Sequence, residues 1–229
     1  MREGAALAAL IAIDGPVASG KTAVGLRLAR ELGYGLVDTG MLYRAVTWLA
    51  LERGVDMADA EALIALAQEA DIRLGQPTSD HAATLSIGGR DVTRELRKPA
   101  VDKNVSLVSR IPGVRQAMVG IQRRLAAEGK IIMLGRDIGT VVLPDAPVKV
   151  FLDASVEVRA RRRHQELAEA GVSVTIEEIR ADLEQRDEMD RNRHASPLHP
   201  ADDAILIDTS ELTLEEVVER VRQAAGVRA

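Results

Sequence analysis

The residues of this chain best suited to chemistry lie near its start, in the run Gly15-Pro16-Val17-Ala18-Ser19-Gly20-Lys21-Thr22. This run has the spacing G-x-x-x-x-G-K-[ST], in which glycines let the backbone approach phosphate groups and the amides point inward as donors. Lys21 then places a cation on the β- and γ-phosphates, and the hydroxyl of Thr22 can ligate Mg²⁺. We expect the whole run to bind a nucleoside triphosphate.

The segments on either side of this loop fit the same interpretation. Residues 10–13 are a short apolar run typical of a strand, and residues 22–32 carry apolar side chains at helical spacing before Gly33. A strand followed by a glycine-rich turn and a helix places the positive end of the helix dipole at the phosphates. The alternative, an accidental glycine-rich turn, accounts for neither flanking element.

Other polar residues follow predicted strands, where ligands of open α/β sheets bind. They are Asp38-Thr39-Gly40, Arg136-Asp137 and Asp153. Arg136 is suited to bidentate binding of a phosphate, and Asp137 could accept from a ligand amine or lie near a metal. Capping of a helix is the alternative for such an aspartate, and it is favoured for Asp153, which precedes Ala-Ser-x-Glu.

Two groups of arginines occur in the second half of the chain: Arg159, Arg161, Arg162 and Arg163, then Arg186, Arg191 and Arg193. Either group could be a solvated helix face. Phosphoryl transfer, however, needs positive charge at the transferring group and exclusion of water, and a mobile arginine-bearing segment supplies both. The spacing of Arg186, Asp187, Asp190 and Arg193 predicts one helix face that could bind phosphate and ribose, with surface salt bridges as the alternative.

Five apolar runs alternate with helical segments, which indicates an α/β fold with a mostly parallel sheet covered on both faces. The runs begin near residues 10, 34, 131, 148 and 205. Residues 71–74, 83–87 and 90–93 predict three short strands outside that sheet, with a hairpin turn at Gly88-Gly89. A helical stretch over 101–128 should break near Pro112, because the residue before a proline resists the helical conformation.

Composition limits the class of protein. The chain has 229 residues, 46% of them hydrophobic and only 2% aromatic, which predicts one domain with an aliphatic core. It lacks cysteine and an apolar run of membrane-spanning length, and its first apolar stretch leads into the loop. We therefore expect a cytoplasmic protein without a signal peptide. A net charge of −5 argues against nucleic acid as a partner.

With these motifs in place, nearly the whole chain resembles the bacterial cytidylate kinases, which phosphorylate CMP and dCMP with ATP. Four blocks carry the resemblance: Ile13-Asp14-Gly15-Pro16 with Gly20-Lys21-Thr22; Asp38-Thr39-Gly40-Met41-Leu42-Tyr43-Arg44; Gly135-Arg136-Asp137-Ile138-Gly139-Thr140-Val141-Val142 with Pro144-Asp145-Ala146-Pro147; and Arg186-Asp187, Asp190, Arg193 and Pro197-Leu198 with Pro200-Ala201-Asp202-Asp203-Ala204. The first block occurs in many phosphate-loop proteins, whereas the second and third together are specific.

The resemblance implies a P-loop NTPase-type fold: a parallel five-stranded sheet flanked by helices, an acceptor-binding insert containing the short strands, and a helical lid. A single kinase domain would comprise a core of 1–55, 111–156 and 196–229, an insert at about 56–110 and a lid at about 157–195. ATP would be the phosphoryl donor, with Mg²⁺. The resemblance also implies the small-molecule acceptors CMP and dCMP, and we expect a monomer with no membrane partner.

The resemblance also implies roles for individual residues. Arg136 would hold the acceptor's phosphate and Asp137 the cytosine amino edge, which disfavours uracil. Ser106 and Arg115 match positions that contact the base, and Thr39 and Arg44 match other acceptor-site positions. Arg186, Asp190 and Arg193 match residues around the pentose and phosphates, and Arg162 matches a lid arginine facing ATP. The expected catalytic residues are thus Lys21, Arg136, Arg162, Arg186 and Arg193.

Two positions of the loop region depart from the family pattern. Ala18 replaces a common glycine, which should restrict the backbone, and Ala23 stands where a second hydroxyl often contacts the α-phosphate. Because Lys21 and Thr22 are retained, we expect at most slower or weaker use of the triphosphate.

Other functions are weighed against this one. A GTP-dependent switch would need Asn-Lys-x-Asp, which the chain lacks. A P-loop kinase acting on UMP, AMP, shikimate or dephospho-coenzyme A would be revealed by a panel of acceptors. A non-catalytic nucleotide-binding module is disfavoured by Lys21 and the arginine groups, and an assay of ADP release would reveal it.

Overall fold

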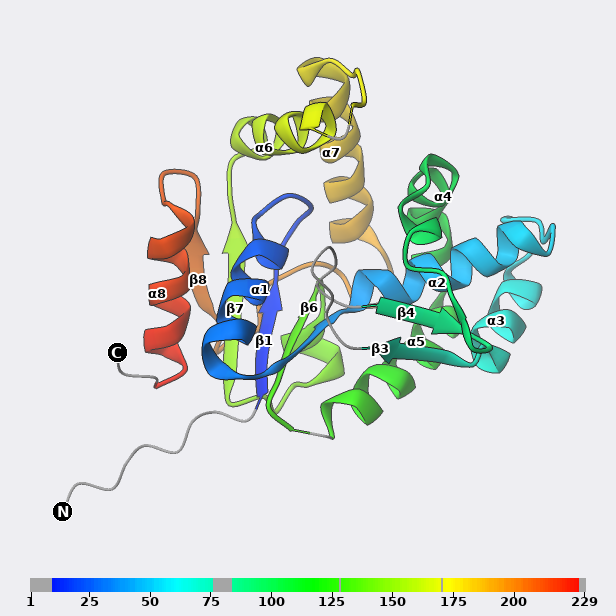
Figure 1. The fold of residues 1–229 in the computed structure, drawn as a ribbon, viewed down its shortest axis with the longest axis horizontal. Helices are drawn as coiled ribbons and strands as arrows, with labels where there is room; N and C mark the ends of the chain where they lie inside the picture. The colour runs from blue at the N-terminus through cyan, green and yellow to red at the C-terminus, as the bar shows by residue number, and fades with distance from the viewer. Residues whose placement is uncertain (1–9, 76–83, 128, 170, 227–229) are drawn as a thin grey trace. The chain divides into compact units, whose positions relative to one another are not determined.

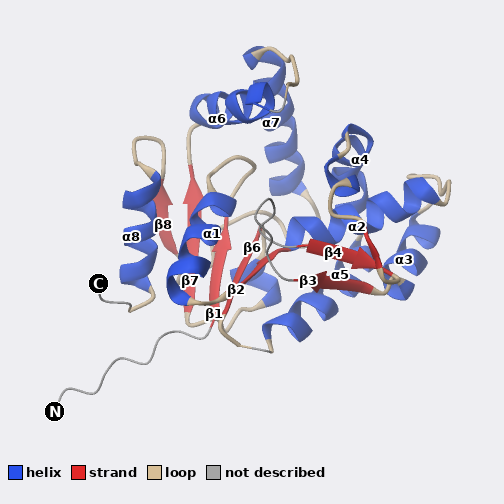
Figure 2. Cartoon of the chain, viewed as in Figure 1, coloured by secondary structure: helices blue, strands red, loops and turns tan. Residues whose placement is uncertain are grey.

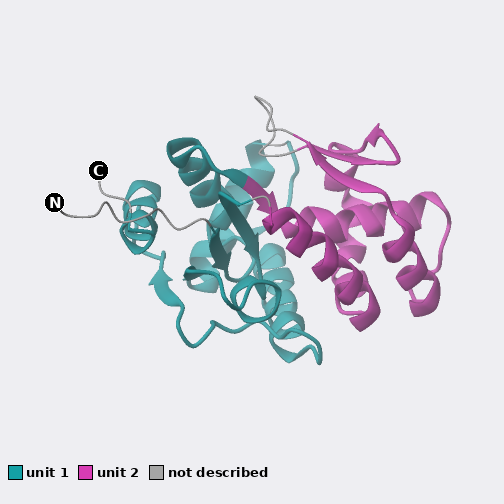
Figure 3. Cartoon of the chain, turned by 90° about the horizontal axis from the view of Figure 1, so that it is seen from below, with its two compact units in different colours: residues 1–35, 129–229 teal, residues 36–128 magenta. Residues whose placement is uncertain are grey.

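A computed structural model describes residues 10–75, 84–127, 129–169 and 171–226 of the chain. The chain forms two compact units, residues 1–35 with 129–229 and residues 36–128 (Figure 3). The expectations that concern residues 1–9, Ala83, Glu128 and Ala170 lie outside the described residues.

The main sheet has five strands, as the sequence predicted, and their order is β2-β6-β1-β7-β8, of which Figure 1 labels the last four. β1 pairs in parallel with β6, from Leu10 opposite Ile131 to Asp14 opposite Gly135, and also with β7, which pairs in parallel with β8. β1 and β6 are almost completely buried, as expected for strands covered on both faces. The bounds are β1 Leu10–Asp14, β2 Gly35–Asp38, β6 Ile131–Gly135, β7 Val148–Asp153 and β8 Ile205–Asp208.

The helices of the unit formed by residues 1–35 and 129–229 are α1 Lys21–Leu32, the one-turn π-helix η2 Ile138–Val142, α6 Val156–Glu169, α7 Ile176–Asn192 and α8 Leu214–Ala224. α6 and α7 lie beyond the arrowheads of β1 and β7 (Figure 2). α7 begins with a capping box in which Thr175 and Glu178 bond reciprocally. α6 and α7 share a small core of Ala160, Ile179 and Leu183.

The unit of residues 36–128 contains four helices and an antiparallel sheet of order β3-β4-β5 among its described residues. The hairpin between β4 and β5 turns at Gly88 and Gly89, whose φ angles of 56° and 81° suit glycine. The predicted break before Pro112 is confirmed. The bounds are α2 Thr39–Glu52, α3 Ala60–Glu69, β3 Ile72–Gly75, β4 Thr84–Ile87, β5 Arg90–Asp91, the 3-10 turn η1 Glu95–Arg97, α4 Pro99–Ser109 and α5 Pro112–Ala126.

The core of this second unit is largely aliphatic, as the low aromatic content predicted. Leu63, Val108 and Met118 are fully buried, and Trp48, the chain's single tryptophan, is also buried. α3 and α5 pack closely, because a Cβ on Gly113 would lie 2.5 Å from Cδ1 of Ile64. Within the described ranges, no helix combines the length and apolar character needed to cross a membrane.

Candidate functional site

The phosphate-binding loop Gly15–Thr22 has the geometry that its glycines predict. Gly15 has φ 148°, and a Cβ there would lie 2.0 Å from the carbonyl oxygen of Leu152, so no other residue fits. Gly20 has φ 96° and caps α1. The ammonium of Lys21 lies within the loop, where it donates to the carbonyl of Pro16 at 2.5 Å and to Oγ of Ser19 at 3.3 Å. A cation and the start of α1 thus face one cradle.

The two alanines that depart from the family pattern differ in their conformation. Ala18 has φ 60°, in the left-handed region, where a Cβ costs roughly 1–2 kcal/mol. The expected backbone restriction is therefore a strain carried within the loop. Ala23 is exposed in the first turn of α1, beside the exposed Thr22.

Asp14, which ends β1, connects this loop to the turn that carries Arg136 and Asp137. Its carboxylate accepts from the backbone N–H groups of Ile138 and Gly139, each at 2.8 Å. Burial raises the pKa of Asp14 to about 6, the two N–H groups oppose that rise, and the charge of Asp137 adds to it. The carboxylate therefore fixes the start of η2, and with it the turn after β6.

The turn after β6 and the residues around the end of α7 form a charged cluster. Nε of Arg136 donates to Asp190 at 2.9 Å, and Nη1 of Arg193 lies 3.4 Å from the other carboxylate oxygen of Asp190. Arg193 also lies 3.9 Å from Asp137 and donates through Nε to the carbonyl of Ser196. The structure thus brings together four predicted site residues, with arginines and carboxylates alternating.

Two residues of the predicted mixed face on α7 have other partners. Arg186 pairs with Asp182 at 3.0 Å, one turn earlier in the same helix. Asp187 is bonded away from the charged cluster, to a residue of α6. Its carboxylate is buried and bonds to Arg159 of α6, with Nη2 to Oδ2 at 2.6 Å.

Arg162 of α6 reaches the loop after β8. It donates through Nη1 to the hydroxyl of Thr209 at 2.9 Å and through Nη2 to the Thr209 carbonyl at 2.6 Å. The Thr209 hydroxyl in turn donates to the carbonyl of Ser19 in the phosphate-binding loop at 3.2 Å. Partial burial lowers the pKa of Arg162 from its usual value. These bonds connect Arg162, a predicted lid arginine, to the phosphate-binding loop through Thr209.

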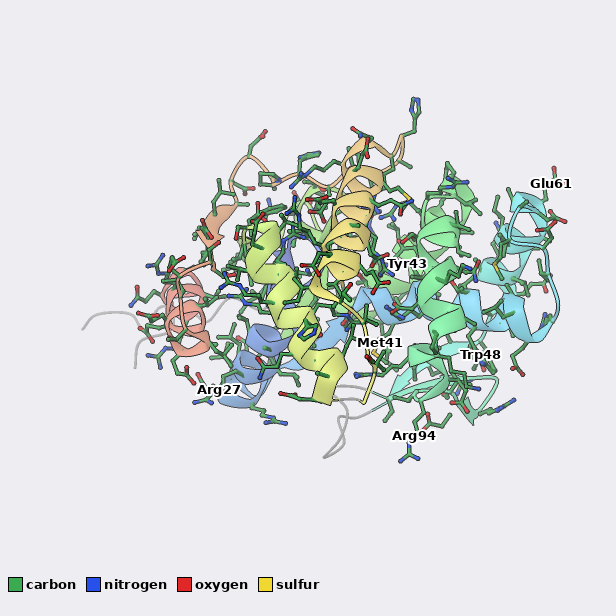
Figure 4. All side chains as sticks on the ribbon, turned by 90° about the horizontal axis from the view of Figure 1, so that it is seen from above. Arg27, Met41, Tyr43, Trp48, Glu61 and Arg94 are labelled. Atoms are coloured by element: carbon green, nitrogen blue, oxygen red, sulfur yellow. The ribbon has the colours of Figure 1, made fainter. Side chains whose placement is uncertain are left out.

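The remaining predicted site residues lie in the unit of residues 36–128. Arg44 on α2 pairs with Asp102 at 2.5 Å and donates to the carbonyl of Leu96 at 3.1 Å. Arg115 on α5 is buried, donates to the carbonyl of Ser109 at 3.0 Å, and lies 5.2 Å from the ring centre of Tyr43. Figure 4 labels Tyr43 on α2.

Two further predicted residues complete that unit's set. Thr39 is buried at the start of α2, where the carboxylate of Asp38 accepts from the N–H of Gly40 at 3.0 Å. Ser106 is half-buried on α4, and its carbonyl accepts from the hydroxyl of Ser109 at 3.3 Å. Among the predicted residues of this unit, the guanidinium groups of Arg44 and Arg115 are each fixed by contacts within the unit.

Sequence reasoning missed three partners: Asp102 of Arg44, Thr209 of Arg162 and the tie between Arg159 and Asp187. Arg159 stood in a recognised arginine group, but its spacing did not distinguish it from its exposed neighbour Arg161. A partner far along the chain has no local signal. Only the fold reveals which of several arginines is buried and bonded.

No set of three or more His, Cys, Asp or Glu side chains is gathered into a metal cage in the described parts of the chain. Mg²⁺ commonly binds through substrate phosphates and one or two protein oxygens, so it needs no such cage. Thr22 is exposed and lies next to Lys21, and the chemistry of its hydroxyl suits that mode of binding.

Similarity to known proteins covers most of the chain. The family described as "Cytidylate kinase" matches residues 11–226. The cytidylate kinase of Geobacillus kaustophilus (strain HTA426) is 47% identical over 218 residues, which cover 95% of this chain and 96% of that protein. The bifunctional pantoate ligase/cytidylate kinase of Synechococcus sp. (strain JA-3-3Ab) is 47% identical over 93% of this chain and 39% of that protein.

Among solved structures, an uncharacterized protein from Eubacterium ventriosum ATCC 27560 has a similar fold, with a TM-score of 0.51 at 11% identity. The match covers 96% of this chain and 99% of that one.

Proposed function

The chain belongs to the cytidylate kinase family, and on that premise we propose that it transfers the γ-phosphoryl group of ATP to CMP and dCMP. The products are ADP and the corresponding cytidine diphosphates. The observation that carries the proposal is the direct bonding of Asp14, the residue before the phosphate-binding loop, to the turn that bears Arg136 and Asp137. A donor loop and an acceptor-reading turn are thereby held in one unit.

On the donor side, the loop amides and Lys21 hold the β- and γ-phosphates of ATP. Thr22 would hold Mg²⁺, which would neutralise negative charge that develops during transfer. Arg162 faces the donor from α6, where its bonds to Thr209 support that placement. The Gly15 backbone, which leaves no room for a Cβ, keeps the cradle open to phosphate.

On the acceptor side, an oxygen of the CMP phosphate attacks the γ-phosphorus, and the bond from that phosphorus to the β–γ bridging oxygen breaks. The attacking phosphate is already ionised, so the protein needs mainly to position it and to stabilise charge. Arg136 and Arg193 are assigned to the phosphates, Arg186 to the transferring group, and Asp190 to the pentose. The contacts of Arg136 and Arg193 with Asp190 support the assignments of these three residues, and Arg186 lies one turn before Asp190 on the same helix.

Recognition of the base is assigned to Asp137, Ser106 and Arg115. A carboxylate at Asp137 accepts from the cytosine amino group and repels the carbonyl that uracil presents at the same position. Arg115 is buried against the Tyr43 ring, which supports a fixed orientation for its guanidinium. Thr39 and Arg44 are assigned to the acceptor nucleotide, and the Arg44–Asp102 pair fixes that arginine.

An acceptor panel tests the proposal. ADP release from Mg-ATP is measured with CMP, dCMP, UMP, AMP, shikimate and dephospho-coenzyme A as acceptors. We expect CMP and dCMP to give by far the fastest turnover. A protein that binds Mg-ATP and leaves CMP untouched, or one that prefers AMP, would overturn the assignment.

Two variants test the assigned roles. Lys21→Met and Arg136→Ala should each abolish useful turnover, because each removes a cation from the transferring phosphates. Arg27→Ala is the matched control, since Arg27 pairs with Glu31 on the exposed face of α1. Near-normal rates in Lys21→Met and Arg136→Ala would refute these roles.

We also propose that the enzyme acts as a monomer in the cytosol. Light scattering of the purified chain checks the first proposal, and cell fractionation checks the second.

A further inference from the structure

Arg159 of α6 bonds at once to the phosphate-binding loop and to helix α7. Its Nη1 donates to the carbonyl of Val17 at 3.2 Å and to Oδ1 of Asp187 at 3.2 Å. Its Nη2 donates to Oδ2 of Asp187 at 2.6 Å, and its Nε to the carbonyl of Ala154 at 2.9 Å. The side chains of Arg159 and Asp187 are only 4% and 7% exposed. One rigid guanidinium fork therefore fixes three segments relative to one another.

The side chain of Val17 makes a second, independent contact with the same helices. It packs against the small core that α6 and α7 share, which consists of Ala160, Ile179 and Leu183. Val17 is thus held through its backbone carbonyl and through its side chain. A shift of Val17 in the loop cannot leave both contacts with the helix pair unchanged.

Helix α7 carries the other end of the connection. Asp187 follows Arg186 directly and precedes by less than one turn Asp190, which bonds to Arg136. An open pocket of about 520 Å³ lies between the start of α6 and the second half of α7, with Arg159, Asp187, Glu188 and Arg191 in its lining. The ion pair borders this pocket, and there it adds a polar connection between the two helices to the small core that they share.

We propose that Arg159 and Asp187 are positioning residues for phosphoryl transfer, which convey the conformation of Val17 in the phosphate-binding loop to Arg186 and Asp190 on α7. When phosphates draw the loop amides inward, the Val17 carbonyl moves, and the fork follows it only by carrying Asp187 along. Binding of the donor thereby sets the arginine-bearing helix for transfer. This inference rests on the proposed function for its kinetic consequence.

Kinetics of conservative variants test the positioning role. Arg159→Lys keeps the charge but replaces a planar fork with a point charge that cannot serve the same four acceptors. We expect kcat to fall at least tenfold while KM for ATP stays within threefold, because the loop amides and Lys21 are unchanged. Arg161→Lys, on the same helix but exposed, is the control and should stay within twofold of the unmodified protein. A kcat for Arg159→Lys within threefold of normal would overturn the proposal.

Hydrogen exchange distinguishes coupling between the phosphate-binding loop and α7 from a merely structural role of Arg159. With Mg-ATP and no acceptor, residues 156–169 and 176–192 of the unmodified protein should exchange at least fivefold more slowly than without it. Arg159→Lys should lose most of this response and Val17→Ala part of it, whereas Arg161→Lys should keep it. A full response to ATP in Arg159→Lys would contradict the inference, whatever the response of Val17→Ala.

The double variant Arg159→Met/Asp187→Leu covers the case in which a single variant fails to fold. Replacing a buried ion pair with apolar residues often preserves stability. We expect normal exchange without ATP and no slowing with it, and a slowing equal to that of the unmodified protein would overturn the proposal. The exchange experiment needs only ATP, so it tests the connection between the phosphate-binding loop and α7 even if the unmodified protein does not phosphorylate CMP. A failure to phosphorylate CMP would refute the proposed function alone.

Discussion

Replacing Asp14 with Asn should change how the free energy of unfolding depends on pH. The carboxylate is 5% exposed, and its burial raises its pKa from 3.8 to about 6. A carboxylate with a raised pKa binds its proton more readily in the folded state than in the unfolded one. The resulting stabilisation is fully present below pH 3.8 and is lost as the pH rises through 6.

The size of the effect follows from the pKa difference. A shift from 3.8 to about 6 corresponds to about 3 kcal/mol over the full range. About 1.4 kcal/mol of this is lost between pH 5 and pH 8, where the protein can be studied without acid denaturation. Asn cannot titrate, so the free energy of unfolding of Asp14→Asn, relative to the unmodified protein, should rise by about 1.4 kcal/mol across that interval.

Urea titrations at pH 5, 6, 7 and 8 measure this difference. Far-ultraviolet circular dichroism is the suitable signal, because Trp48 lies in the other unit and its fluorescence does not report on β1. Asp153→Asn, at the end of the neighbouring strand β7, controls for the loss of a strand-end carboxylate. If the stability curves of Asp14→Asn and the unmodified protein run parallel, or if Asp153→Asn gives the same divergence, the buried charge of Asp14 is not the cause.

Three further predictions concern the loop and the bound nucleotides. Ala18→Gly should raise the free energy of unfolding by about 1 kcal/mol, because glycine adopts a positive φ without strain. Ala181→Gly, on the exposed face of α7, is the control and should lower the free energy of unfolding by about 1 kcal/mol. Urea titration measures both changes, and changes of the same sign would contradict the strain at Ala18. Asp137→Ala should reduce the preference for CMP over UMP in kcat/KM by at least about tenfold, because the variant lacks the carboxylate that accepts from the cytosine amino group and repels the uracil carbonyl. An unchanged ratio would exclude the base-reading role. Arg162→Met should raise KM for ATP about tenfold in initial-rate assays, because it removes charged hydrogen bonds to Thr209 beside the donor loop, and a rise confined to KM for CMP would be the contrary result.

Much of the fold could be predicted because its signals are local. The strand, turn and helix around Gly15–Thr22 share one short segment, and the hairpin at Gly88-Gly89 and the break before Pro112 depend on single residue types. The order of the strands could not be predicted, because an apolar run does not specify its neighbours. The π-helical turn that follows Arg136 and Asp137 could not be predicted from the residue types there.

The site was less predictable wherever one residue depends on a distant partner. Asp14 bonds to amides 124 and 125 residues away, and Arg44 to a carboxylate 58 residues away. Residue type and the family resemblance predict that Arg136 binds a phosphate. They could not identify Arg159 as the buried member of its group, because burial there depends on how α6 and α7 pack.

The division of the chain into one continuous unit and one interrupted unit has a consequence for synthesis on the ribosome. Residues 36–128 carry their own core and can collapse as soon as they emerge, whereas β1 finds its first central partner only when residues 131–135 have been made. Pairing across so long an interval is slow, and domains generally fold as units during synthesis. We expect residues 36–128 of the nascent chain to fold while β1 is still unpaired, before β6 has been synthesised.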